Sequence, residues 1–77
     1  MALNQAEFRS RVMQARIMQG LGEHTAYWEG YERGLRRAFL GELSVSDGEN
    51  SWLWAAADSS DSNERERGVG YREALNH

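Results

Sequence analysis

Residues 25–41 read TAYWEGYERGLRRAFLG, and this stretch decides the fold class. Its apolar and small residues recur every three or four positions, as they do along the buried face of an amphipathic α-helix. The helix is predicted to begin near Thr25 and to end before Gly41. Gly30 and Gly34 lie inside it, where a glycine costs about 1 kcal/mol relative to an alanine. We therefore expect another part of the chain to pack closely against these two glycines.

Three further helices are predicted at capping pairs, in which a side-chain oxygen accepts a hydrogen bond from the backbone N–H three residues later. The pairs are Asn4 with Glu7, Ser46 with Glu49 and Asp61 with Glu64, and the predicted helices span residues 4–19, 47–57 and 62–75. The chain contains no proline, and no stretch alternates β-branched residues as a half-buried strand does. The sequence therefore predicts an all-α protein, a compact bundle of three to four short helices that forms one domain over residues 1–77.

A short pattern occurs twice in the chain. The dipeptide Gly-Tyr, with a leucine four residues beyond the tyrosine, lies at residues 30–35 and again at residues 70–75. The repeat has two explanations, an internal duplication or two helices that each use a glycine to bring a tyrosine against a neighbour. Of these, we favour the second.

The charge of the chain differs between its two halves. The first 40 residues contain six arginines and four glutamates, whereas the rest contains three arginines, five glutamates and three aspartates, and the net charge is −3. Glu29 with Arg33 and Glu32 with Arg36 have the i,i+4 spacing that stabilises an exposed helix face. The pI near 5.3 and the lack of lysine make nucleic acid the less favoured partner. A small DNA-binding transcriptional regulator that uses the arginines of the first two helices remains the alternative.

The side chains that catalysis needs are scarce. The chain has no cysteine, and its two histidines are His24 and His77. They cannot build a Ser-His-Asp triad or a His-Glu-x-x-His zinc motif. Neighbouring carboxylates such as Glu29 and Glu32 lie among arginines, which is typical of a solvated helix face. We expect no enzymatic activity, no cofactor and no metal site.

Length and hydropathy bear on where the chain acts. No apolar run approaches the ~18 residues of a membrane-spanning helix, and the first residues lack the basic and then apolar order of a signal peptide. The absence of cysteine fits a reducing compartment, so we expect a cytoplasmic protein without a membrane partner. A chain this short buries only about 60% of the surface of its unfolded state, so we also expect a protein partner or a second copy.

The aromatic residues are the main candidates for binding, because tryptophan, tyrosine and arginine dominate binding hot spots. Trp52 and Trp54 are two positions apart on one helix, so their side chains point about 200° apart and cannot both face one core. One of them either covers a neighbouring helix or is buried by a partner. We predict a partner-binding surface that combines Trp52 or Trp54 with the arginines of the second helix. Those arginines are Arg33, Arg36 and Arg37.

The helix over residues 4–19 has apolar residues on two sides. Phe8, Val12 and Ala15 form one stripe, and Met13 and Ile17 lie on a different side. The second pair either contacts another helix or forms the seam of a homodimer. Met13 and Ile17 are therefore the candidates for self-association.

Three segments form a further pattern. They are YWEGYERGLRR at residues 27–37 with Gly41 after it, WLW at residues 52–54, and RGVGYR at residues 67–72. Over about residues 15–75 this pattern resembles small uncharacterised helical proteins that temperate phages and prophages of proteobacteria encode. Such proteins are often accessory factors. The resemblance therefore implies a protein that binds a host protein in the host cytoplasm and inhibits or modulates it, for example an anti-CRISPR or other anti-defence factor.

Overall fold

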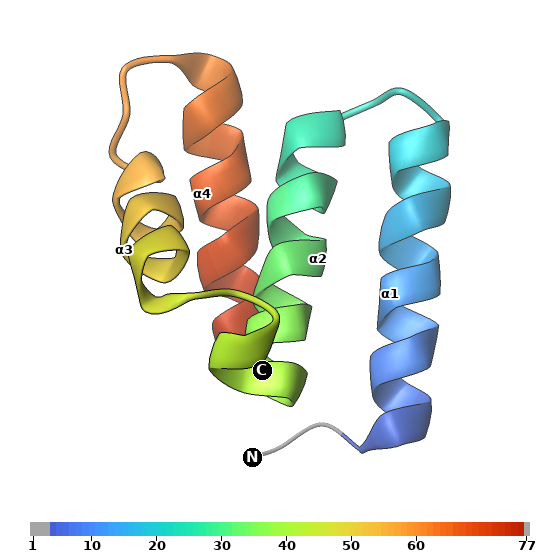
Figure 1. Ribbon diagram of the computed structural model, residues 1–77. Coiled ribbons are helices and arrows are strands. Elements are labelled where there is room, and N and C mark those ends of the chain that lie inside the picture. The colour runs from blue at the N-terminus through green and yellow to red at the C-terminus, as the bar shows by residue number, and fades with distance from the viewer. Residues whose placement is uncertain (1–3, 77) are drawn as a thin grey trace.

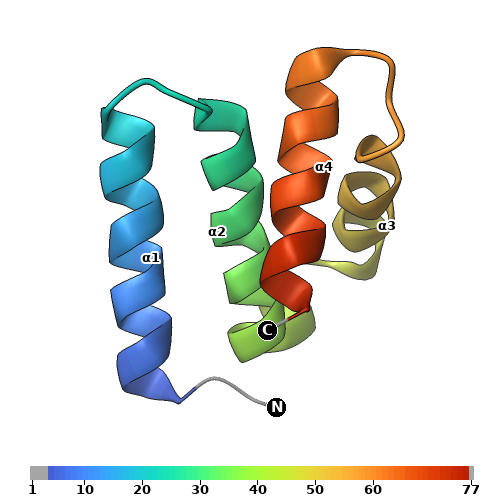
Figure 2. The ribbon, with the colours of Figure 1, turned by 180° about the vertical axis from the view of Figure 1, so that it is seen from behind.

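The computed structural model describes residues 4–76 and shows an all-α bundle, as predicted. The elements are α1 (Gln5–Gly20), α2 (Thr25–Leu40), the short 3-10 helix η1 (Gly41–Leu43), α3 (Asp47–Ala56) and α4 (Ser62–Leu75). Figures 1 and 2 show α2 and α4 side by side and running in the same direction, with α1 outside α2 and α3 outside α4. The bounds predicted for α2 and α4 are confirmed, and those of α1 and α3 differ by one residue. The connector after Gly41 contains η1, which the sequence did not predict.

The helix ends follow the predicted capping pairs. The side chain of Asn4 accepts a hydrogen bond from the backbone N–H of Glu7 at 2.8 Å, and Ser46 and Asp61 cap α3 and α4 in the same way. The start of α2 is different, because His24 precedes it with a left-handed backbone (φ 52°) and makes no side-chain cap. Gly41, with φ 74°, ends α2 in a conformation that favours glycine.

Glycines bring α2 and α4 into backbone contact. A Cβ atom placed on Gly30 would lie 1.8 Å from the carbonyl oxygen of Arg67, and one on Gly70 would lie 2.0 Å from that of Tyr27. These distances are far inside van der Waals contact, so no side chain fits between the helices at these positions. A Cβ atom on Gly34 would likewise lie 2.6 Å from the carbonyl oxygen of Tyr71, so the close approach expected at Gly30 and Gly34 is confirmed. Gly30 and Gly70 of the repeated pattern each face the helix that carries the other.

The buried side chains form two clusters, and α4 contributes to both of them. The first contains Val12, Leu35 and Ala74, with Phe8 and Tyr31 packed against it, and the second contains Val45, Leu53 and Tyr71, with Leu75 packed against it. The hydroxyl of Tyr71 donates a hydrogen bond to the side chain of Asn50 in α3, and burial raises the pKa of Tyr71 above its ordinary value. The second cluster thus fixes α3 and its preceding connector on α4.

Helix α1 is the outermost element on the other side. It buries Val12 and Ala15 against α2, and the ring of Phe8 stacks on Phe39 with centroids 4.4 Å apart. Met13 and Ile17 point away from this contact and are 64% and 59% exposed. Within residues 4–76 no second helix covers them. In the same part of the chain, none of the helices has the length and apolar character needed to cross a membrane.

Candidate protein-binding grooves

The two tryptophans of α3 both lie at the surface. Trp52 is 54% exposed and Trp54 is 45% exposed, whereas Leu53 between them is buried. Helix α3 packs on α4 through Leu53 and Ala56, so the tryptophans flank the buried face of α3 and neither enters the interior. As expected, the two side chains point in different directions: Trp54 lies against Arg72 of α4, and Trp52 lines a groove.

Trp54 is partly covered by α4. The guanidinium carbon of Arg72 lies 4.9 Å from the centre of the Trp54 ring, in a cation–π contact. The same guanidinium donates hydrogen bonds to the Trp54 carbonyl oxygen and, at 3.2 Å, to the carboxylate of Asp58. Trp54 therefore covers a neighbouring helix, which is one of the two alternatives for these residues.

Trp52 lines a groove of about 370 Å³, here named the tryptophan groove. Its other lining residues come from all four α-helices and are Gln19, Glu29, Glu32, Arg33, Glu49, Leu53 and Arg67. Within residues 4–76, Trp52 has no ring contact or hydrogen bond to its side chain. The groove thus offers an open aromatic ring beside charged side chains.

The charges of the tryptophan groove are paired across elements. Arg33 binds both carboxylate oxygens of Glu49, at 3.0 and 2.7 Å, and Arg67 of α4 reaches Glu29 of α2 at 3.2 Å. The predicted pair of Glu29 with Arg33 is therefore wrong, because each side chain takes a partner from another helix. A two-point contact such as that of Arg33 with Glu49 is geometrically specific, so it fixes the wall of the groove beside Trp52.

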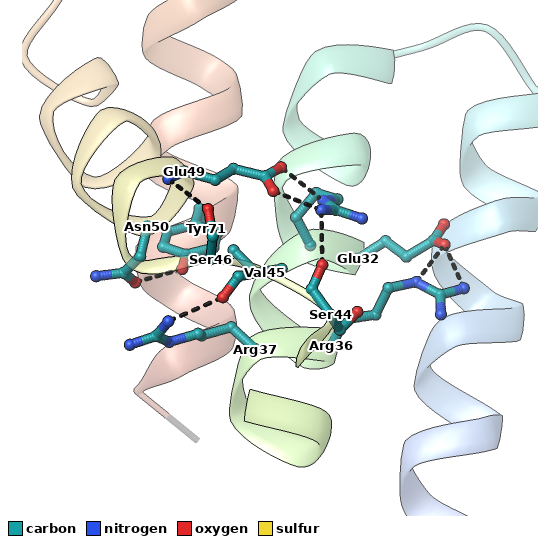
Figure 3. Close-up of polar contacts among 10 residues, drawn as sticks. Glu32, Arg36, Arg37, Ser44, Val45, Ser46, Glu49, Asn50 and Tyr71 are labelled. Carbon is teal, nitrogen blue, oxygen red and sulfur yellow. Dashed lines mark hydrogen bonds and ion pairs between the residues drawn. The ribbon is translucent and has the colours of Figure 1, made fainter. Parts of the chain in front are cut away.

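The three arginines predicted for the binding surface do not all lie together. Arg33 lines the tryptophan groove with Trp52, so the structure brings this pair together. Arg37 turns toward the connector, where it donates to the Val45 carbonyl oxygen at 2.8 Å (Figure 3). It also donates to Asp47 at 3.0 Å. Arg36 turns toward Glu32 on the α1 side of α2, as the same figure shows. Arg33 also donates to the connector, at the Ser44 carbonyl oxygen at 3.1 Å, so Arg33 and Arg37 share one face of α2. Arg36 does not join them.

Glu32 is the polar link between α1 and α2. It accepts hydrogen bonds from Gln19 at 3.1 Å and from Arg36 at 3.1 and 3.0 Å, and Arg16 lies 3.5 Å away. Burial alone would raise the pKa of Glu32, but the hydrogen bonds from Arg36 and Gln19 and the charges of Arg36 and Arg16 outweigh it. The pKa of Glu32 is consequently lowered below its ordinary value, and the carboxylate stays ionised.

A second groove lies between α1 and α2 and has a volume of about 290 Å³. We name it the arginine groove, and its lining residues are Phe8, Arg9, Val12, Met13, Arg16 and Arg36. Met13 thus borders a groove, whereas Ile17 is exposed but does not line it. The two candidates for self-association therefore differ, because only Met13 lies at the edge of the arginine groove.

His24 lies beside a third pocket, which α1 and α2 form with Glu66. Nδ1 of His24 lies 3.1 Å from Glu66, beside an apolar pocket of about 340 Å³ that Met18, Tyr27 and Trp28 help to form. His77 lies outside the described residues. Among residues 4–76, no group of three or more histidines, cysteines, aspartates or glutamates is placed to hold a metal ion.

Comparison with known proteins adds no functional assignment. No protein-family model, curated protein sequence or solved structure matches this chain. The grooves and their side chains are therefore the basis for a functional proposal.

Proposed function

We propose that this chain is a small non-enzymatic accessory protein that binds a host protein in the cytoplasm and thereby inhibits or modulates it. The observation that carries the proposal is the pair of surface tryptophans on α3, and above all the open ring of Trp52 in the tryptophan groove. Tryptophan is the residue type most enriched at the centres of protein interfaces, where it buries a large area at small cost in conformational entropy. The resemblance to phage and prophage accessory proteins points to the same class of function.

The walls of the tryptophan groove favour a protein partner. Arg33 and Glu49 are fixed by their two-point contact, so the polar wall is ordered before a partner arrives. Trp52 supplies the apolar contact beside it. An apolar anchor with a polar rim is the ordinary composition of a protein interface.

Self-association through Met13 and Ile17 is a separate proposal. Both side chains are exposed on α1, which fits a seam with a second copy. The measurement is the molar mass in solution by light scattering. A dimer that Ile17→Ser converts to a monomer supports the seam, and a monomer at all concentrations contradicts it.

The test of the main proposal is capture of a host protein from a nuclease-treated lysate by the tagged chain. We expect one defined protein to be retained by the wild type and lost with Trp52→Ala, while the helical circular dichroism spectrum is unchanged. Leu43→Ala is the matched control, since Leu43 is fully exposed in η1 and lies outside the tryptophan groove.

Two results would contradict the proposal. Equal capture by wild type and Trp52→Ala would show that the tryptophan groove is not the binding surface. Recovery of nucleic acid alone, lost with nuclease or at high salt, would favour the DNA-binding alternative, because phosphate contacts release counterions.

A further inference from the structure

The arginine groove carries more positive charge than its surroundings neutralise. Three arginines line it, Arg9, Arg16 and Arg36, and no aspartate or glutamate is among its lining residues. The carboxylate of Glu32 serves two of them, Arg36 at 3.0 Å and Arg16 at 3.5 Å. Arg9 has no hydrogen-bond or ion-pair partner within residues 4–76. The guanidinium group of Arg9 is therefore available to bind a negatively charged group of a ligand.

The floor of the arginine groove is apolar. Val12 is almost fully buried, Phe8 is half-buried and stacked on Phe39, and Met13 is largely exposed at the edge. Methionine is flexible and polarisable, so it adapts its shape to different apolar surfaces. An apolar strip flanked by guanidinium groups matches a ligand that is itself both apolar and acidic.

We propose that the arginine groove binds an acidic amphipathic helix of a partner protein. An amphipathic helix places its apolar residues in such a groove at i, i+3, i+4 and i+7, and its carboxylates then lie within reach of the rim. Arg9 and Arg16 form ion pairs with those carboxylates, while Phe8 and Met13 contact the apolar residues. This surface is separate from Trp52, so it goes beyond the binding function proposed above, although it shares Met13 with the proposed self-association seam.

Two other occupants fit the arginine groove less well. A nucleic acid backbone would use the guanidinium groups but leave Met13 and Phe8 facing polar phosphates and sugars. A second copy joined through a two-fold contact would place the same patch on both sides of the interface. That contact would bring the arginines of both copies into one interface, and like charges at close range repel.

The test uses two synthetic helical peptides of about 18 residues, long enough to span the groove as a helix. Both carry leucine at i, i+3, i+4 and i+7, and the flanking positions are glutamate in one and lysine in the other. Binding of the fluorescein-labelled peptides is measured by anisotropy at about 0.15 M salt, where distant charges are screened. We expect the glutamate peptide to bind at least about fivefold more tightly than the lysine peptide.

Charge reversal locates the contact. Arg9→Glu should weaken the glutamate peptide about threefold to tenfold and strengthen the lysine peptide, because Arg9 is exposed and has no described partner to lose. Arg65→Glu is the matched control, since it makes the same charge change at an exposed position of α4 outside the arginine groove. Trp52→Ala should leave peptide binding unchanged, which separates this proposal from the one above.

Each contrary result overturns the proposal. Equal binding of the two peptides, binding of neither, or the same loss with Arg65→Glu as with Arg9→Glu would show that the groove does not select an acidic helix. A DNA duplex that displaces the glutamate peptide and is itself weakened by Arg9→Glu would assign the groove to nucleic acid. A dimer in sedimentation that Arg9→Glu alters and the glutamate peptide dissociates would assign it to a second copy.

Discussion

The two long interfaces of α2 are built in different ways. Toward α4, glycines let the backbones touch, with Gly30 against Arg67 and Gly70 against Tyr27. Toward α1, the contact is made by side chains, chiefly Val12 and the hydrogen bonds around Glu32. Side chains hold α1 at a distance that leaves the arginine groove open beside them. The α2–α4 interface is therefore in backbone contact and supports the fold, whereas the α1–α2 interface leaves surface available for binding.

The largest expected effect is at the α2–α4 interface. Replacing Gly30 by Ala adds about 1 kcal/mol of helix propensity, but its Cβ would lie 1.8 Å from the Arg67 carbonyl oxygen. Because that neighbour is backbone, the two helices must separate, and we expect a net loss of about 3 kcal/mol or more. Urea unfolding followed by circular dichroism measures it. A variant as stable as the wild type would show that the helices do not touch at Gly30.

The second effect concerns the α1–α2 interface. Val12→Ala removes two buried methyl groups from the first cluster, so we expect a loss of about 2 kcal/mol. Because α1 is peripheral, amide hydrogen exchange should rise mainly in α1, while the amides of α2 and α4 stay protected until global unfolding. Equal acceleration in all three helices would contradict the distinction between the two interfaces.

The sequence predicted the helices well because their ends are decided locally. The capping oxygens of Asn4, Ser46 and Asp61 lie three residues from the amides that they bind, so short sequence windows contain the information. The left-handed turn at His24 and the 3-10 helix η1 depend on how α1 and α2 must join and leave the bundle, and neighbouring residues do not specify them.

The candidate site was predicted only in part, because it depends on contacts distant in sequence. Exposure at Met13 and Trp52 follows the helical period. The ion-pair partners of the arginines do not follow the helical period. Arg33 binds Glu49, across the connector, and not Glu29, which lies one turn away on the same helix. The i,i+4 rule describes an isolated helix, and once α3 docks a better two-point contact replaces the local pair. The stacking of Arg72 on Trp54 was missed for the same reason.

The third prediction concerns the pH dependence of the stability that Glu32 contributes at the α1–α2 interface. The pKa of Glu32 is lowered in the folded state, so its contribution to stability is fully present above its ordinary value of 4.5 and is lost as pH falls through the folded pKa. Glu32→Gln should therefore cost about 1 kcal/mol at neutral pH, and its difference from the wild type should shrink as the pH falls below 4.5. Urea unfolding at several pH values gives the two curves. A difference that stays constant to low pH would show that the charge of Glu32 contributes nothing to the α1–α2 interface.

The smallest expected effect tests whether the loss of stability in Gly30→Ala comes from the neighbours of Gly30 and not from replacing a helical glycine as such. Gly48 lies in the first turn of α3, where an added Cβ would find only the Ser46 hydroxyl oxygen at 4.0 Å. Gly48→Ala therefore meets no obstacle and gains helix propensity, so stability should rise by about 0.5 kcal/mol. The measurement is the same urea titration used for Gly30→Ala. If both alanines raised stability, helix propensity would account for both positions and the backbone contact of α2 with α4 would be excluded. Opposite signs at Gly30 and Gly48 require that contact, because the chemical change is identical and only the neighbouring atoms differ.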